Sequence, residues 1–239
     1  MIKNGSSKNT YIIYIMTLLF CIFTGIILLY TEIQGTHVAA FSEERKQPVL
    51  IIDPGHGGAD GGAVADDGTK ESLINLEISL KLKCLSDLLG VESVIIRDSE
   101  ELPYPDLNAS IAEKKKWDQN RRLYIINSAD NAVLISIHQN YYPDPQPFGA
   151  QVLYAKTDGS RELGEQCHDA LNRFLSPENR RVAAPISEKI FLMKYANCPA
   201  ILVECGFMSN PHELEMLQNV DYQKKIAAII MAAYLCYAV

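Results

Sequence analysis

The chain has 239 residues, which is enough for one domain with a substantial hydrophobic core. Its 22 Lys and Arg against 29 Asp and Glu give a formal net charge of -7, and this acidic balance argues against a nucleic-acid-binding protein. Apolar residues make up 48%, which excludes a disordered or collagen-like chain.

The first apolar segment is long enough to cross a membrane. Residues 9–31 carry no charge, and about twenty helical residues span the roughly 30 Å of a bilayer's hydrocarbon core. Lys3 and Lys8 precede this segment, so the positive-inside rule places the N-terminus in the cytoplasm and the rest of the chain outside. We predict a cytoplasmic tail at 1–10, a transmembrane signal-anchor at 11–31 and a tether at 32–47. The alternative is a signal peptide cleaved near residues 38–40, which would leave a secreted protein.

The remainder of the chain alternates short apolar runs with helical patterns, which is typical of an α/β protein. Continuous apolar runs predict buried strands at 48–53, 94–96, 132–137, 149–154, 190–193 and 200–203. Helical spacing predicts helices at 71–89, 107–126, 161–175 and 222–237, and residues 141–147 and 176–187 are expected to be loops. We predict one domain at 48–239, built on a single twisted, mostly parallel sheet with helices on both faces.

Two side-chain patterns give further expectations. In the helix at 71–89, the apolar side is formed by Leu73, Leu76, Leu80, Cys84 and Leu88. The six cysteines include no C-x-x-C pair, so buried free thiols are expected outside the membrane segment, with a Cys198–Cys205 disulfide left open. Because residues 1–31 hold two lysines and no acid, the rest of the chain has a net charge of -9.

Three of the predicted strands end in a residue suited to metal or acid–base chemistry, namely His56, His138 and Glu204. Open α/β sheets bind ligands beyond the carboxyl ends of their strands, so these side chains are expected to lie together. Zinc hydrolases use three protein ligands and a carboxylate that accepts a proton from water. Glu71, at a predicted helix start after a glycine-rich turn, is the candidate third ligand. Spacing alone leaves open Glu77, or a first-turn acid that only complements the helix dipole.

The other histidines have no comparable setting. His37 falls in the predicted tether, His168 in a predicted helix and His212 near a helix start. We expect all three on the surface.

Four segments carry a family resemblance. Residues 52–63 (IDPGHGGADGGA) resemble the opening motif of the zinc-dependent N-acetylmuramoyl-L-alanine amidases, the amidase-3 family. Residues 71–76, 136–140 and 199–210 resemble the second, third and last motifs, in family order. The resemblance covers about residues 48–238. It departs from the family pattern at Ala132, where an acid is usual, and at Cys205, where an apolar residue is commoner.

The resemblance implies a Zn²⁺ held by His56, Glu71 and His138, with Glu204 as the catalytic carboxylate. It also implies hydrolysis of the amide between the lactyl group of N-acetylmuramic acid and L-alanine of the peptidoglycan stem peptide. Asn140, next to the third motif's histidine, is a candidate substrate contact, although a turn residue at a strand end is the alternative. A zinc peptidase or deacetylase acting on another amide, or a non-catalytic peptidoglycan-binding regulator, are the alternatives for the function.

The layout of one anchor and one catalytic domain is similar to the spore-cortex amidases of endospore formers, which trim stem peptides so that muramic lactam can form. This similarity implies a membrane-anchored enzyme whose catalytic domain lies outside the cytoplasmic membrane, in the forespore intermembrane space. Its expected partners are peptidoglycan, the membrane and an activating lipoprotein.

Overall fold

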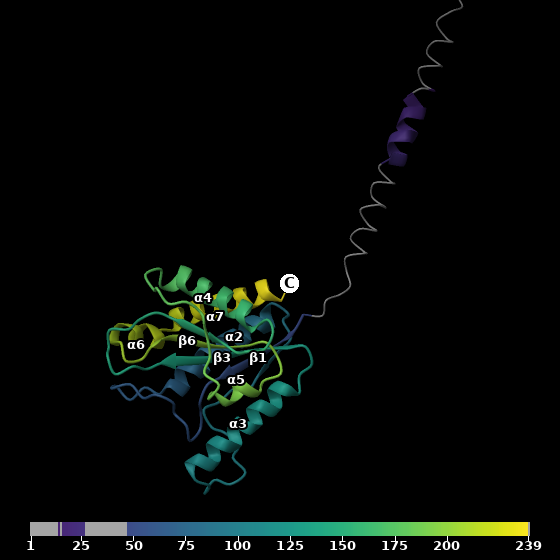
Figure 1. Ribbon diagram of the computed structural model, residues 1–239. Coiled ribbons are helices and arrows are strands. Elements are labelled where there is room, and N and C mark those ends of the chain that lie inside the picture. Colours follow the sequence, from purple (N-terminus) through teal and green to yellow (C-terminus); the bar gives the residue numbers. More distant parts are fainter. Residues whose placement is uncertain (1–13, 15, 27–46, 239) are drawn as a thin grey trace, which may run out of the picture. The chain divides into compact units, whose positions relative to one another are not determined.

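The computed structural model describes residue 14, residues 16–26 and residues 47–238 (Figure 1). The chain forms two units, residues 1–46 and 47–239. Residues 16–26 are helical, and within the described residues no helix has both the length and the apolar character needed to span a bilayer. The predicted tail at 1–10, most of the tether and both ends of the predicted anchor lie outside the described residues.

The larger unit is built on a six-stranded sheet in the order β2-β1-β3-β6-β4-β5. The strands are β1 (Val49–Pro54), β2 (Ser93–Ile95), β3 (Ala132–Asn140), β4 (Gln151–Tyr154), β5 (Ala184–Pro185) and β6 (Ala200–Phe207). The first four strands in spatial order are mutually parallel, and β4 runs antiparallel to β6. The prediction of a mostly parallel sheet is therefore confirmed.

Helices cover both faces of this sheet. They are α2 (Glu71–Leu88), α3 (Ile111–Asn127), α4 (Ser160–Leu175), α5 (Phe191–Tyr195), α6 (Pro211–Gln218) and α7 (Val220–Tyr237). Figure 1 shows α2, α4, α6 and α7 on one side of the sheet, with α3 and α5 on the other. The central strands are apolar on both sides because each side faces a hydrophobic cluster: Leu50 and Ile52 of β1 belong to one, and Ile51 to the other.

The buried side of α2 differs from the predicted one. Of the five apolar residues at helical spacing, only Leu76 is buried. Leu73 is 42% exposed, Leu80 is 39% exposed and Leu88 is 79% exposed. Cys84 is exposed as well. The buried side instead combines apolar and polar residues, namely Glu71, Ser72, Ile74, Asn75, Ile78, Ser79, Leu82 and Ser86. Because this side of α2 carries several polar residues, hydrophobic spacing does not identify it as the buried side.

Residues 190–193 do not form the predicted strand. They lie at the start of α5, a short helix whose Met193 packs into the cluster beneath the sheet. An apolar run of four residues fits a buried strand and one turn of buried helix equally well, so the pattern could not separate them. The predicted loop at 176–187 contains the short strand β5. The helix predicted from residue 107 begins at Ile111, because Ser110 caps α3 through a capping box with Glu113.

His168 is buried, contrary to the expectation of a surface position. Its Nδ1 accepts a hydrogen bond from the Val152 backbone N–H at 3.3 Å, and its Nε2 donates to the Arg181 carbonyl at 2.8 Å. Both ring nitrogens are therefore satisfied inside the protein. His212 is exposed, as expected, and His37 lies outside the described residues.

The cysteines divide into two groups. Cys167, Cys198 and Cys205 are buried free thiols, so the 198–205 pair is not joined. Cys84 and Cys236 are exposed, which corrects the expectation that they are buried.

Candidate active site

A cleft of about 370 Å³ opens near the carboxyl ends of β1, β3 and β6. Residues that approach it from these strands include His56, two residues beyond β1, and His138 and Glu204, which face each other in the parallel register of β3 and β6. The strands run further than predicted, so His138 and Glu204 lie within them and not at their last residue. All three predicted strand-end residues line the same cleft.

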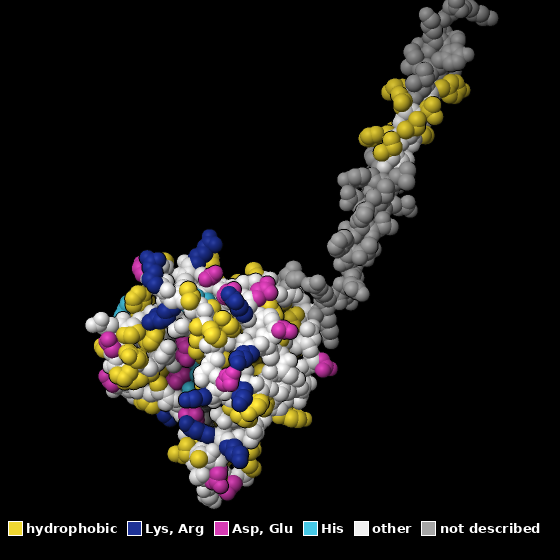
Figure 2. Space-filling model, in the orientation of Figure 1, with side chains coloured by type: hydrophobic (Ala, Val, Ile, Leu, Met, Phe, Trp, Pro, Cys, Tyr) yellow, Lys and Arg dark blue, Asp and Glu magenta, His cyan; other side chains and the backbone are white. Residues whose placement is uncertain are grey.

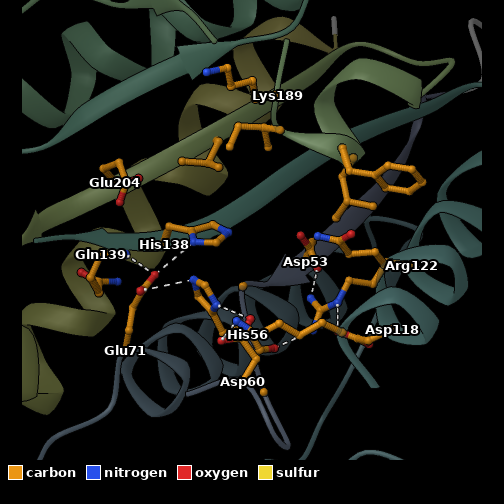
Figure 3. A pocket seen from close by; sticks show the side chains of 18 of the residues that line it. Asp53, His56, Asp60, Glu71, Asp118, Arg122, His138, Gln139, Lys189 and Glu204 are labelled. Carbon is orange, nitrogen blue, oxygen red and sulfur yellow. Dashed lines mark hydrogen bonds and ion pairs between the residues drawn. The ribbon is translucent and has the colours of Figure 1, made fainter. Parts of the chain in front are cut away.

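His56, Glu71 and His138 form a cluster suited to a metal ion. One ligand atom from each residue lies within 4.8 Å of the other two. His56 Nε2 is 3.3 Å from Glu71 Oε2, and His138 Nδ1 is 3.0 Å from Glu71 Oε1. Ligands of a tetrahedral Zn²⁺ with bonds near 2.1 Å lie about 3.4 Å apart, so the cluster needs little adjustment to hold one. Figure 3 shows the Glu71 carboxylate directed at both rings.

Glu71 is fixed in place by donors from three segments. Its carboxylate accepts hydrogen bonds from the backbone N–H of Ala63 at 3.0 Å and of Gln139 at 3.1 Å, and from the Asn75 side chain at 3.2 Å. The glycine-rich turn allows this close packing. A Cβ on Gly62, which has a φ of +70°, would come within 2.5 Å of Glu71 Oε2, and one on Gly55 within 2.4 Å of the His138 ring.

His56 has a backbone conformation that is rare for a residue with a side chain, with a φ of 60°. Arg122 of α3 donates to the His56 carbonyl at 2.5 Å and to the Pro54 carbonyl at 2.8 Å. Arg97, after β2, donates to the carbonyls of Pro54 and Gly55 at 3.1 and 2.9 Å. Two buried guanidinium groups thus hold three successive carbonyls of the turn that presents His56.

Two buried carboxylates neutralise Arg122. Its guanidinium forms ion pairs with Asp53 at the end of β1 and, at 2.6 Å, with Asp118 of α3. Asp53 also accepts a hydrogen bond from the Ser136 hydroxyl of β3 at 2.6 Å. Although burial acts to raise the pKa of Asp53, Arg122 and Ser136 hold it below its usual range, so this carboxylate stays ionised. The network joins β1, β3 and α3 beneath the cleft.

Without a metal, the three side chains of the cluster stabilise one another's charged forms. Burial acts to raise the pKa of Glu71, but hydrogen bonds and charge from His138 and His56 hold it well below its usual range. Burial acts to lower the pKa of His56, but hydrogen bonds to Asp60 and Glu71 raise it to about 9. A metal ion bound here would displace a proton from His56, because a ligand must offer its lone pair.

Glu204 lies beside the cluster in a different environment. Burial raises the pKa of its carboxyl to about 7, and the charge of Glu71 adds to this effect while His138 and His56 oppose it. Within the described part of the chain, its buried Oε2 has no hydrogen-bond partner. A carboxyl group with such a pKa and a free oxygen in a cleft can accept and return a proton near neutral pH.

The remaining predicted site residues lie elsewhere. Glu77 is exposed and accepts a hydrogen bond from Gln223 of α7 at 2.6 Å, so it is not part of the cluster. Asn140 ends β3, where its carbonyl accepts from the Met208 N–H at 2.8 Å, and it is not among the residues lining the cleft. Its role as a substrate contact stays a prediction.

Sequence reasoning missed the residues that support the cluster, chiefly Asp53, Asp60, Asn75, Arg97 and Arg122. Asp60 pairs with His56 Nδ1 at 3.1 Å and orients the ring. One signal was available, since Asn75 follows Glu71 by four residues and therefore shares its side of α2. The arginines had no such local signal.

Comparison with known proteins shows the family to which the chain belongs. The chain matches the N-acetylmuramoyl-L-alanine amidase family (Amidase_3) over residues 50–235. The germination-specific N-acetylmuramoyl-L-alanine amidase of Bacillus subtilis (strain 168) is 32% identical over 190 residues, which are 79% of each chain. The amidase LytC of the same strain is 26% identical, and the match spans 79% of this chain but 36% of that protein.

Solved structures give the same result. The CwlD amidase from Clostridioides difficile, determined in complex with the GerS lipoprotein, has a TM-score of 0.76 and 34% identity, covering 80% of this chain and 98% of that one. An N-acetylmuramoyl-L-alanine amidase from Clostridium difficile 630 has a TM-score of 0.67 and 29% identity, covering 80% and 96%. The chain therefore belongs to the N-acetylmuramoyl-L-alanine amidase family, enzymes that act on peptidoglycan.

Proposed function

We propose that the amidase activity of this chain depends on Zn²⁺ held by His56, Glu71 and His138, with Glu204 as the catalytic carboxylate. The observation that carries the proposal is the set of three ligand atoms within 4.8 Å of one another, beside a carboxyl group whose pKa is raised to about 7. Two histidines and one carboxylate are a common catalytic zinc set that leaves a position free for water.

The residues divide the chemistry between them. When bound, Zn²⁺ would lower the pKa of a water molecule and polarise the carbonyl of the scissile amide. Glu204 takes a proton from the attacking water and then delivers it to the leaving amine nitrogen of L-alanine. Asp60 keeps His56 in the orientation that directs Nε2 at the cluster, through the 3.1 Å contact with Nδ1.

The proposed role is in spore-cortex maturation, through removal of stem peptides before muramic lactam formation. The 32% identity to a germination-specific amidase and the 34% identity to the CwlD amidase support this role. The proposal includes residues 11–31 as a membrane anchor that keeps the catalytic domain outside the cytoplasmic membrane. It also includes a lipoprotein partner, since the CwlD amidase was solved in complex with one.

The test combines metal analysis with digestion of purified sacculi. We expect the wild-type chain to bind one Zn²⁺ and to release stem peptides from cortex sacculi, detected by mass spectrometry, with activity lost on chelation. Glu204→Gln should retain the metal and lose at least 100-fold in turnover, the scale of general acid–base catalysis. His138→Ala should lose the metal.

A matched control is Glu215→Gln, which changes an exposed glutamate of α6. It should leave metal content and turnover unchanged. Full turnover by Glu204→Gln would remove this residue from the mechanism, and wild-type metal content in His138→Ala would refute the ligand set. If the zinc-loaded chain alone is inactive, a purified lipoprotein is added. Activity that appears then shows that the chain needs an activator, and continued inactivity counts against the amidase function.

A further inference from the structure

The cations lining the cleft are not equivalent. Arg122 is buried between Asp53 and Asp118, and Lys115 forms an ion pair with Asp60 at 2.9 Å. Lys189 is exposed, and within the part of the chain that the structure describes its ammonium has no ion-pair or hydrogen-bond partner. One lining cation is thus available to a ligand.

Lys189 belongs to a distinct wall of the cleft. It lies two residues before α5, and the next three residues, Ile190, Phe191 and Leu192, line the cleft with it. We call these four residues the α5 wall. In Figure 3, the two histidines lie between Lys189 and Asp60, so Lys189 and Asp60, the ion-pair partner of Lys115, lie on opposite sides of the two rings.

Among the described charged residues that line the cleft, Lys189 is the one available to bind an anion. Five carboxylates line the cleft, namely Asp53, Asp60, Glu71, Asp118 and Glu204. Residues 32–239 carry a net charge of -9, so the domain as a whole repels acidic ligands. Figure 2 shows Lys and Arg side chains gathered over α3 and α5, near the point where histidine and acidic side chains reach the surface. Because Lys115 and Arg122 of α3 are already paired with carboxylates, an acidic ligand is attracted to Lys189, on the α5 side of the cleft.

The substrate presents such a ligand. A stem peptide continues beyond L-alanine into residues that carry free carboxylates, whereas the glycan on the other side of the scissile amide is neutral apart from its own peptides. We propose that Lys189 binds the carboxylate of the residue that follows L-alanine. The peptide then lies along the α5 wall, with its apolar groups against Ile190 and Leu192, and the glycan leaves over the Asp60–Lys115 side.

This inference rests on the amidase function and assigns the peptide side of its site. Lys189 acts as a specificity-determining residue, because a charged amine prefers a carboxylate over the uncharged carboxamide of the same shape. A charge-assisted contact at a partly open site changes affinity about five- to tenfold.

The test uses two muramoyl tripeptides that differ only at the second residue, which is D-glutamate in one and D-isoglutamine in the other. We expect Lys189→Ala, in the zinc-loaded full chain, to raise KM for the D-glutamate substrate about five- to tenfold. KM for the D-isoglutamine substrate, kcat for both and zinc content should stay within about twofold. Lys194→Ala is the matched control, because Lys194 is a nearby lysine on α5 that lies over the Tyr195 ring, 5.1 Å from its centroid, and does not line the cleft.

Binding of both tripeptides to the Glu204→Gln chain, with and without Lys189→Ala, reports the contact without turnover. A loss of affinity confined to the D-glutamate peptide supports the assignment. An equal effect on both peptides, or none, overturns it. Lack of turnover by the wild type would count against the amidase function alone, since the binding experiment judges Lys189 separately.

Discussion

Replacing Arg122 by methionine tests the role of the buried network beneath the cleft. Methionine keeps most of the side-chain volume but removes every donor. Asp53 and Asp118 would lose their shared counter-charge, and the carbonyls of Pro54 and His56 would lose a donor. Breaking a buried ion pair by removing one partner costs about 3–5 kcal/mol, because a buried charge is left uncompensated.

This loss is large compared with the stability of a domain. For a domain of this size, each kcal/mol lowers Tm by about 2–4 °C, so Arg122→Met should lower Tm by about 6–20 °C. The assay is calorimetry of the metal-free chain, with Arg173→Met as the matched control, because Arg173 is exposed on α4 and lies 5.4 Å from the Phe174 ring. Arg122→Lys should fall between these two, since lysine keeps the charge but not the planar set of donors.

The same variant should also weaken the metal site. With its carbonyl released, His56 is no longer held at its φ of 60°, a conformation that costs energy in an unsupported turn. We expect Zn²⁺ affinity to fall about 10- to 100-fold at a temperature where the variant is folded. A Tm within about 2 °C of Arg173→Met, together with unchanged zinc affinity, would refute the reasoning.

Two smaller perturbations follow from the same structure. Asn75→Ala removes a donor to Glu71 and to the Gly55 carbonyl, and it should weaken Zn²⁺ binding about 10- to 100-fold in a competition titration, whereas Ser79→Ala on the same helix should not. Ser110→Ala removes the capping box of α3 and should cost about 1 kcal/mol, seen as a Tm lower by about 2–4 °C with unchanged zinc content. Unaltered zinc affinity in the first variant, or unaltered Tm in the second, contradicts the corresponding contact.

The sequence brings together the residues proposed to carry chemistry better than the residues that support them. His56, His138 and Glu204 follow or close apolar runs, and parallel strands bring such positions to one edge of a sheet, where all three line the cleft. Arg122 was not found, since it lies 68 and 69 residues away from Pro54 and Asp53, its partners in β1. Contacts of this separation are set by the packing of α3 on the sheet, which no local pattern contains.

The sequence predicts the sheet and the helices on both of its faces, but it does not predict which side of every helix is buried. Hydrophobic periodicity assigned the leucines of α2 to the core, yet Leu73, Leu80 and Leu88 face outward. The inward side of this helix holds Glu71 and Asn75, because it contributes to the candidate metal cluster as well as to the core. A helix that serves a site thus violates the pattern by which helices are recognised.

The strand order has a consequence for the order in which the enzyme becomes complete. All three proposed metal ligands lie within the first 138 residues, on segments that belong to the β1–β3 half of the sheet. Glu204 is on β6, which is made last among the strands and must enter between β3 and β4, two strands that precede it in the chain. A chain that emerges N-terminus first can therefore assemble the half that carries the proposed metal ligands before Glu204 is in place. Insertion of the final strand both closes the sheet and supplies Glu204, the proposed proton acceptor, so under the proposed mechanism hydrolytic competence arrives only when folding is complete.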